Sequence, residues 1–249
     1  MNTIKKDDLF KSKQGDSCVV LEYINCYEVL IKFLDGVGYE RTVRADHLRS
    51  GTFSNPYFKS VFGVGFLGEG NYKCQSDNGK ISPEYQCWFD MIRRCYSENS
   101  HIKAPTYINC SVDDRWHNFQ NFAAWFHGKG GYKKGYQLDK DILVKGNKVY
   151  SEDNCCFVPR QINNLFISSG NTSDILPIGV SFSKVMGKFV SAMSVNGRIK
   201  TLGYSDCAAE AHSFYVEAKE AYVKNKAIEW RHEIDDRVFK ALIKWRMSA

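Results

Sequence analysis

The 249-residue sequence contains no apolar run that approaches the length of a membrane-spanning helix, and its first segment, MNTIKKDDLFKSK, lacks the apolar core of a signal peptide. We therefore expect a cytoplasmic protein without a membrane partner. The nine cysteines include no Cys-x-x-Cys pair. This favours buried free thiols, with a structural zinc site as the lesser alternative. The glycine-rich run GVGFLGEG lacks the Lys-Ser/Thr of a phosphate-binding loop, so residues 55–82 read as a connection.

What the sequence does contain is typical of a folded, modular protein. Hydrophobic residues make up 43% of the chain, and the formal charge of +6 permits nucleic-acid binding without requiring it. Changes in hydrophobic period predict an α+β protein with three parts: residues 1–70, 82–167 and 176–249. The segment SSGNTSD at 168–174 is polar and reads as a linker.

Residues 15–66 alternate apolar and polar side chains in short bursts, separated by turn residues such as Gly36-Val37-Gly38. Several short strands within about fifty residues predict a small twisted β-barrel of the kind that often holds a peptide or a nucleic acid. Arg41, Arg44 and Arg49 could meet phosphate there. The alternative is that they are simply solvated surface arginines.

Two amphipathic helices are predicted next. The first begins at a capping Ser82 followed by Pro83, and it places Trp88, Met91 and Cys95 on one apolar stripe. The second, Trp116 to Phe126, repeats aromatic residues at three- and four-residue spacing.

The stretch from Tyr136 to Phe166 reads as strand, turn, strand and helix. Residues 137–144 and 149–158 alternate as strands around a Gly-Asn turn at 145–148, and Pro159 fits the first turn of a helix that runs through Phe166. Six lysines surround this predicted hairpin against two aspartates, which suggests a phosphate-facing surface or, alternatively, a solvated rim. These lysines are Lys129, Lys133, Lys134, Lys140, Lys145 and Lys148.

The third part is predicted to be a three-stranded antiparallel sheet covered by a helix. Asn196-Gly197 is a strong two-residue hairpin signal, and an alanine- and tyrosine-rich helix begins at Ser205 or Asp206. Residues 178–205 contain four basic residues and no acidic one, as phosphate contact requires: Lys184, Lys188, Arg198 and Lys200. Residues 229–249 are predicted to continue as a helix for docking or dimerisation.

Residues 82–167 resemble the ββα-metal unit of phage HNH homing endonucleases. The resemblance rests on Trp88-x-x-Met91-x-x-Arg94-Cys95, on Trp116-x-x-Phe119-x-x-Phe122, on Leu138-Asp139-Lys140, on Asn154-Cys155, and on Gln161 followed by Asn163-Asn164. It implies that Asp139 and Asn163 (or Asn164) bind Mg²⁺ or Mn²⁺, and that Asn154 braces the hairpin.

Lys140 departs from the family, because it stands where the general-base histidine is expected. A lysine at its usual pKa is protonated at neutral pH and cannot take a proton from water. Either its pKa is depressed, or it stabilises charge on the phosphate, or another residue replaces it, or cutting is lost. His117 and His127 are candidate replacements, although a lone histidine is more often a hydrogen-bonded or surface residue.

Residues 178–215 resemble the Apetala-2 (ethylene-responsive-factor) DNA-binding domain that phage HNH proteins often carry as a tail. The matching residues are Ile178-Gly179-Val180, Lys188 to Ala192, Leu202-Gly203-Tyr204, and Ala208 to Ala211 leading to Tyr215. The resemblance implies that the sheet lies in the major groove of duplex DNA. A protein-binding module is the alternative.

Three functions are therefore expected in turn. The first is a phage-type, metal-dependent DNA endonuclease acting in the host cytoplasm. The second is a DNA-binding or regulatory protein on an HNH scaffold that no longer cuts. The third is a phage accessory protein that binds a host protein, with a homodimer also possible.

Overall fold

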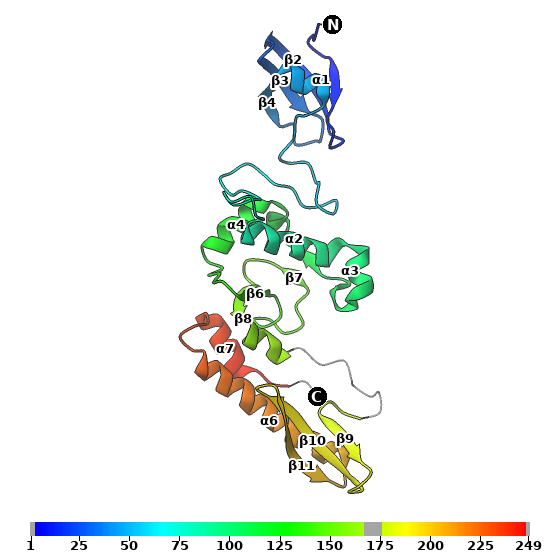
Figure 1. The fold of residues 1–249 in the computed structure, drawn as a ribbon, viewed down its shortest axis with the longest axis vertical. Coiled ribbons are helices and arrows are strands. Elements are labelled where there is room, and N and C mark those ends of the chain that lie inside the picture. Colours follow the sequence, from blue (N-terminus) through cyan, green and yellow to red (C-terminus); the bar gives the residue numbers. More distant parts are fainter. Residues whose placement is uncertain (1–2, 167–175, 248–249) are drawn as a thin grey trace. The chain divides into compact units, whose positions relative to one another are not determined.

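The computed structural model describes residues 3–166 and 176–247 (Figure 1). The chain is an α+β protein that divides into two compact units. Unit 1 comprises residues 1–130 and 148–153, and unit 2 comprises residues 131–147 and 154–249. The linker predicted at 168–174 lies outside the described residues. Within the described ranges, no helix is long and apolar enough to cross a membrane.

An antiparallel sheet in the order β1-β2-β3-β4 forms the first part of unit 1. Its core side carries alternating apolar residues, as the sequence predicted, and helix α1 follows the last strand. The elements are β1 (Leu9–Lys11), β2 (Ser17–Asn25), β3 (Glu28–Phe33), β4 (Glu40–Val43) and α1 (Ala45–Ser50).

The predicted barrel is not closed. Strands β1 and β4 do not pair within the described ranges, so the sheet stays open at both edges. Helix α1 contributes Ala45 and Leu48 to the core formed by the sheet, where a closing strand pair would otherwise exclude water. Gly51, with φ of 69°, ends this short helix in the left-handed conformation.

The rest of unit 1 is helical and aromatic. Ser82 caps α2 as predicted, accepting a hydrogen bond from the Tyr85 amide at 3.3 Å, and the Trp88 indole donates to the Trp116 carbonyl at 2.7 Å. The second helix begins later than predicted, because Asn118 caps it and the residues before it form a 3-10 turn. The elements are α2 (Pro83–Tyr96), α3 (Glu98–Lys103), η1 (Pro105–Tyr107), β5 (Ser111–Val112), η2 (Asp114–His117), α4 (Phe119–His127) and β7 (Val149–Tyr150).

The glycine-rich segment 55–82 does more than connect, contrary to the sequence interpretation. Phe66 forms a parallel bridge with Asn118. A Cβ atom on Gly65 would lie 2.9 Å from the Trp88 ring. The segment therefore packs against the aromatic helices of unit 1.

The predicted hairpin of residues 137–158 is also wrong in its detail. Strand β6 (Tyr136–Asp139) pairs antiparallel with β8 (Cys156–Pro159), so the strands are shorter than predicted and a long loop joins them. Val149 and Tyr150 pair instead with β5 in parallel. Pro159 ends β8 and precedes α5 (Arg160–Asn163), which continues as η3 (Asn164–Phe166).

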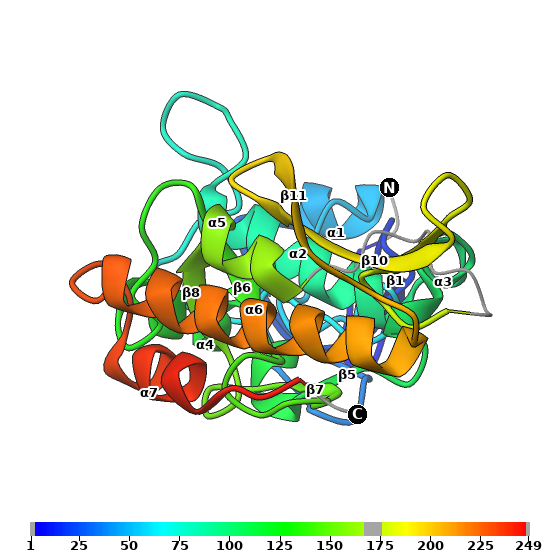
Figure 2. The same cartoon turned by 90° about the horizontal axis from the view of Figure 1, so that it is seen from below.

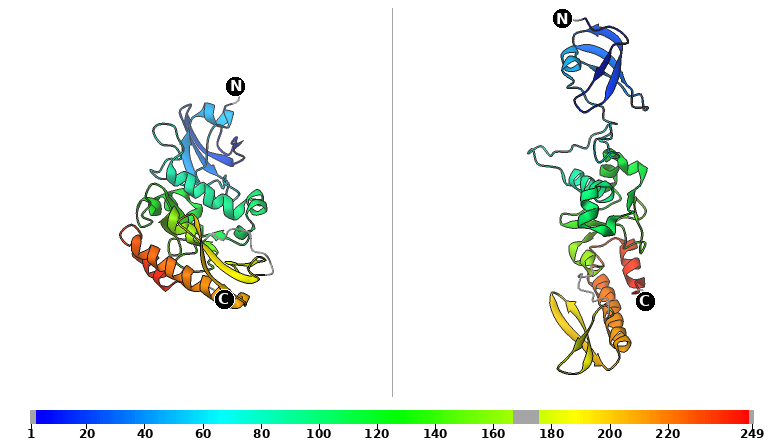
Figure 3. Two further views of the ribbon diagram at one scale, coloured as in Figure 1. Left: turned by 60° about the horizontal axis from the view of Figure 1, so that its bottom comes forward. Right: turned by 90° about the vertical axis from the view of Figure 1, so that its right-hand side faces the viewer.

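The third predicted part is confirmed as a three-stranded antiparallel sheet in the order β11-β10-β9, with a helix packed on it (Figure 3). Ser191 and Met193 of the middle strand are buried, and Gly203 approaches the Phe214 ring of the helix. The elements are β9 (Val180–Ser183), β10 (Lys188–Val195), β11 (Arg198–Ser205) and α6 (Ala208–Glu229).

Helix α6 also belongs to a second core within unit 2. Its Val223 and Ala227 pack with β8, α5 and helix α7 (Asp236–Lys244), and Figure 2 shows α7 beside α6. The predicted continuous C-terminal helix is interrupted before Asp235, which caps α7. One helix therefore holds both the ββα elements and the three-stranded sheet.

Candidate functional site

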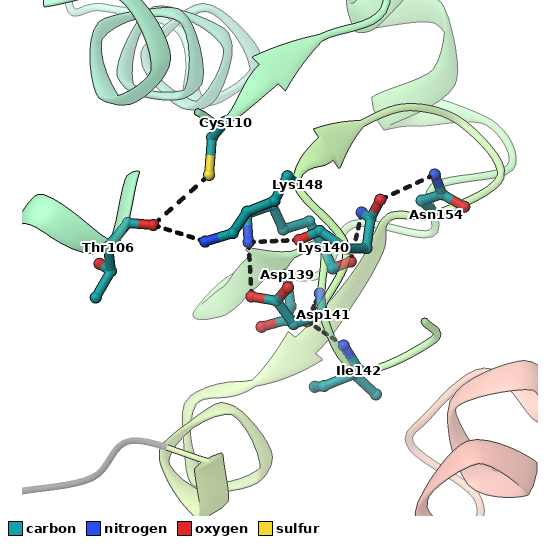
Figure 4. Close-up of polar contacts among 9 residues, drawn as sticks. Thr106, Cys110, Asp139, Lys140, Asp141, Ile142, Lys148 and Asn154 are labelled. Atoms are coloured by element: carbon teal, nitrogen blue, oxygen red, sulfur yellow. Dashed lines mark hydrogen bonds and ion pairs between the residues drawn. The ribbon is translucent and has the colours of Figure 1, made fainter. Parts of the chain in front are cut away.

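The carboxylate of Asp139 lies at the end of β6, where the chain leaves the sheet (Figure 4). Its Oδ1 atom accepts hydrogen bonds from the amides of Asp141 and Ile142, both at 2.7 Å. This turn ends the strand, which explains why the predicted strand stops early. Burial raises the pKa of the Asp139 carboxyl, and the two amide donors oppose that shift.

Oδ2 of Asp139 receives no hydrogen bond from the described residues, so one carboxylate oxygen stays available to a cation or a water molecule. An oxygen with this freedom beside a fixed partner oxygen is what a monodentate metal ligand needs.

Lys140 is buried, with 6% of its surface exposed. Its ammonium donates to Oδ2 of Asp141 at 2.7 Å and to the Asn147 carbonyl at 3.0 Å (Figure 4). The lysine that replaces the expected histidine is therefore tied into the loop beneath β6. An ammonium held by a carboxylate keeps its proton, so this geometry suits a structural or electrostatic role rather than a general base.

Asparagines organise the loop between β6 and β8. The Asn147 side-chain amide donates to the Lys140 carbonyl at 2.9 Å, and the Asn154 amide donates to the Asn147 side-chain oxygen at 3.4 Å. Asn154 thus contacts the loop, in the bracing position that the resemblance implies. Asn147 was missed by the sequence analysis, which read it only as a turn residue.

Asn163, on α5, donates its side-chain amide to the Gln137 side-chain oxygen at 2.8 Å. Gln137 lies two residues before Asp139 on β6, so both side chains belong to the same face of the strand. The helix therefore presents an amide to the strand face that carries the candidate metal ligand. Gln137 was also missed, because a lone glutamine carries no recognisable spacing.

The donor set for a metal is small. The described residues contain no group of three or more His, Cys, Asp or Glu side chains able to hold a metal ion. Asp139 supplies one carboxylate and Asn163 one amide oxygen. Such a set fits Mg²⁺, which keeps several waters and is completed by substrate phosphates, better than it fits a caged Ca²⁺ or Zn²⁺.

The candidate histidines both belong to unit 1. His117 Nε2 lies 3.3 Å from the Tyr96 hydroxyl, and its Nδ1 lies 3.5 Å from the Asp114 carboxylate. His127 stacks on Tyr72, with ring centroids 5.4 Å apart, and lies 3.6 Å from Glu84. Each histidine has partners within its own unit, as structural histidines do.

No protein-family model, curated protein or solved structure matches the chain. What the chain does must therefore be argued from its own surfaces.

The three-stranded sheet has one face covered by α6 and one open face. Val180, Ser191 and Gly203 share a register and face the helix. The alternate residues form the open face, which consists mainly of small side chains. We define this sheet face as Ser181, Ser183, Lys188, Val190, Ala192, Ser194, Ile199, Thr201 and Tyr204.

The four basic residues predicted to bind DNA are all exposed, but they lie at different places around the sheet. Lys188 belongs to the sheet face and lies 3.5 Å from Asp206, an acidic neighbour just beyond the segment in which none was noted. Arg198 and Lys200 pair with Val195 and Met193, so they lie on the helix side of edge strand β11. Lys184 lies in the turn after β9. The cations thus flank a small-residue face.

The lysines around the predicted hairpin are mostly engaged. Lys133 lies 3.0 Å from Glu233 and over the Tyr136 ring, at 5.5 Å from its centroid. Lys129 pairs with Glu152 at 2.8 Å within unit 1. Lys134 is exposed and forms no ion pair with any described residue. These acidic partners could not be found from sequence spacing, because Glu233 lies a hundred residues away.

Proposed function

We propose that the chain binds double-stranded DNA through the sheet face of unit 2. The observation that carries the proposal is the combination of a helix-backed, small-residue face with exposed cations along its margins. Small side chains let a sheet approach base edges closely, and flanking lysine and arginine side chains then reach the phosphates on either side. A β-sheet of this width is one of the elements that the major groove admits.

The test is a titration of duplex DNA by fluorescence anisotropy over a range of salt concentrations. The variant carries Lys184→Gln, Lys188→Gln, Arg198→Gln and Lys200→Gln together. We expect binding to weaken by about 10²-fold or more and the slope of log affinity against log salt to become shallower by about 0.9 for each lost phosphate contact.

The matched control removes four exposed lysines of unit 1: Lys6→Gln, Lys59→Gln, Lys80→Gln and Lys103→Gln. It makes the same change in net charge, so an equal loss of affinity would mean that only total charge matters and would contradict the proposal. Failure of the native chain to bind DNA would favour the host-protein alternative.

A second candidate is cleavage of the bound DNA by a divalent metal ion. It is supported by the uncommitted Oδ2 of Asp139 and by Asn163 on the helix beside the same strand face. Mg²⁺ or Mn²⁺ at these residues would supply a Lewis acid for the scissile phosphate. The residues themselves hold the donors in place, and Lys140 keeps its proton in the loop.

Supercoiled plasmid separates the two candidates. The native chain is incubated with Mg²⁺, with Mn²⁺ and with chelator, beside Asp139→Ala. Metal-dependent nicking that the variant lacks would establish an endonuclease. DNA that is shifted in a gel but stays intact with every metal would leave a DNA-binding protein on an HNH-like scaffold.

A further inference from the structure

A cavity of about 220 Å³ opens in unit 1 beside β4, α1 and the residues that follow α1. In Figure 1 these elements lie in the blue part of the chain. Two arginines, a histidine and an exposed tyrosine line it, together with hydroxyl groups, and no lining residue is acidic. We call it the arginine pocket and define it by Tyr27, Arg41, Arg44, His47, Thr52 and Ser54.

Arg41 carries the uncompensated charge of this pocket. It lies on edge strand β4 opposite Ile31, and its guanidinium donates to the Ser54 carbonyl at 2.9 Å. Within the described ranges it pairs with no carboxylate. One hydrogen bond fixes the group while most of its N–H donors remain for a ligand, which is the geometry in which arginine binds oxyanions with two parallel bonds.

Arg44 is held in place by two neighbours. Its guanidinium forms paired hydrogen bonds of 3.0 and 3.1 Å with Asp46 and lies 5.1 Å from the centre of the Tyr27 ring. The hydrogen bond with Asp46 raises the pKa of Arg44. Its side chain is therefore already ordered before a ligand arrives, which lowers the entropic cost of binding.

We propose that the arginine pocket binds a phosphate group carried by a phosphate ester. Two guanidinium groups and several hydroxyls match the number and the tetrahedral spread of phosphate oxygens better than the two coplanar oxygens of a carboxylate. The cavity is smaller than the roughly 300–1,000 Å³ of ordinary ligand pockets, so it suits one such group with a short attachment. Tyr27 offers an exposed ring beside it.

The ester has two possible sources: the backbone of a nucleic acid or a free nucleotide. The arginine pocket belongs to unit 1, whereas the proposed DNA-binding face belongs to unit 2. A test with inorganic phosphate therefore does not depend on the DNA-binding proposal.

The experiment follows the side-chain ¹⁵Nε signals of the full chain by NMR at constant ionic strength. Inorganic phosphate, adenosine monophosphate and a short single-stranded oligonucleotide are titrated in turn, with citrate as the carboxylate probe. We expect a saturable shift of the Arg41 signal with all three phosphates. Arg41→Gln, followed through the Arg44 signal, should weaken phosphate binding by about tenfold or more, the effect of one charge-assisted hydrogen-bonding group.

Arg115→Gln is the matched control, because Arg115 is an exposed arginine of the same unit that pairs with Asp113. Arg41→Lys keeps the charge but removes the paired donors, and it replaces Arg41→Gln if that variant does not fold. Either outcome for the source supports the proposal: tighter binding of the oligonucleotide identifies nucleic acid, and equal binding identifies a small ester. The absence of saturation, equal binding by the Arg41 variants, or an equal response to citrate would overturn it.

Discussion

Lys140 is a charged residue whose position in a motif suggests chemistry and whose surroundings suggest structure. Its ammonium is buried and contacts both Asp141 and the Asn147 carbonyl. Asp141 is half exposed and can be rehydrated when the lysine is lost, but the carbonyl would lose its donor. The consequence of removing the charge is therefore a loss of stability more than a loss of binding.

We expect Lys140→Met to lower the free energy of unfolding by about 1–2 kcal/mol, because it leaves a buried acceptor without its donor while keeping the length of the side chain. Urea denaturation measures this change. Lys134→Met, at an exposed lysine without an ion pair among the described residues, should change stability by less than about 0.5 kcal/mol. Equal stability of the two variants would mean that the loop does not depend on Lys140.

Asp139 predicts a pH dependence with a definite sign. Burial raises the pKa of its carboxyl in the folded state, so the folded protein binds this proton more tightly than the unfolded chain. The contribution to stability is then fully present below the unfolded pKa and is lost as pH rises through the folded pKa. At neutral pH the buried charge therefore destabilises the fold.

The variant Asp139→Asn keeps an oxygen for the amides of Asp141 and Ile142 but removes the charge. We expect its melting temperature to exceed that of the native chain by a few degrees at pH 7, and the difference to shrink as pH approaches 4. Calorimetry at several pH values measures both. A variant less stable than the native chain at pH 7 would contradict the assigned cause, and any metal-dependent nicking should be lost in the same variant.

At the scale of elements, close contact of helix α6 with the three-stranded sheet depends on two glycines. Gly179 has φ of 80°, and a Cβ atom there would collide with the Tyr215 ring; a Cβ atom on Gly203 would lie 2.8 Å from Phe214. Gly197 has the same φ of 80° but nothing within 4 Å of a Cβ atom. The pair Gly179 and Gly197 therefore separates backbone strain from steric exclusion.

We expect Gly197→Ala to cost about 1 kcal/mol through its left-handed backbone alone. Gly179→Ala should cost at least about 2 kcal/mol more, because the helix must also move away from the sheet. Thermal unfolding of the two variants and of Gly203→Ala gives the order, with Gly203→Ala next to Gly179→Ala. Similar losses at Gly179 and Gly197 would show that α6 yields easily.

Elements whose folding is decided locally could be predicted from the sequence. Asn196 and Gly197 both have positive φ, as their hairpin turn requires, and the strands around them fall where alternation placed them. The β6–β8 pair was misjudged because the Asp139 side chain ends the strand and Val149 pairs with Ser111, far away in sequence. The burial of Lys140 likewise depends on a carbonyl seven residues away, which no spacing rule identifies.

At the scale of the whole molecule, unit 2 places two parts that the sequence separates into one core. Val158 and Ile162, from the ββα elements, pack with Val223 of α6 and with Val238 and Leu242 of α7. The core of the four-stranded sheet in unit 1 is a separate cluster. Disturbing α7 should therefore reach the candidate site through shared packing and leave that sheet unaffected.

We expect Leu242→Ala, at a side chain that is 1% exposed, to cost about 2–4 kcal/mol through the cavity it leaves. Because the core is shared, hydrogen exchange should accelerate in β8 and α5 as well as in α6 and α7, while the amides of β2 and β3 keep their protection. Ile228→Ala, at an exposed position of α6, is the control and should leave every rate nearly unchanged. Acceleration confined to residues 236–244 would mean that α7 can detach alone, and the ββα elements would then have to be stabilised without it.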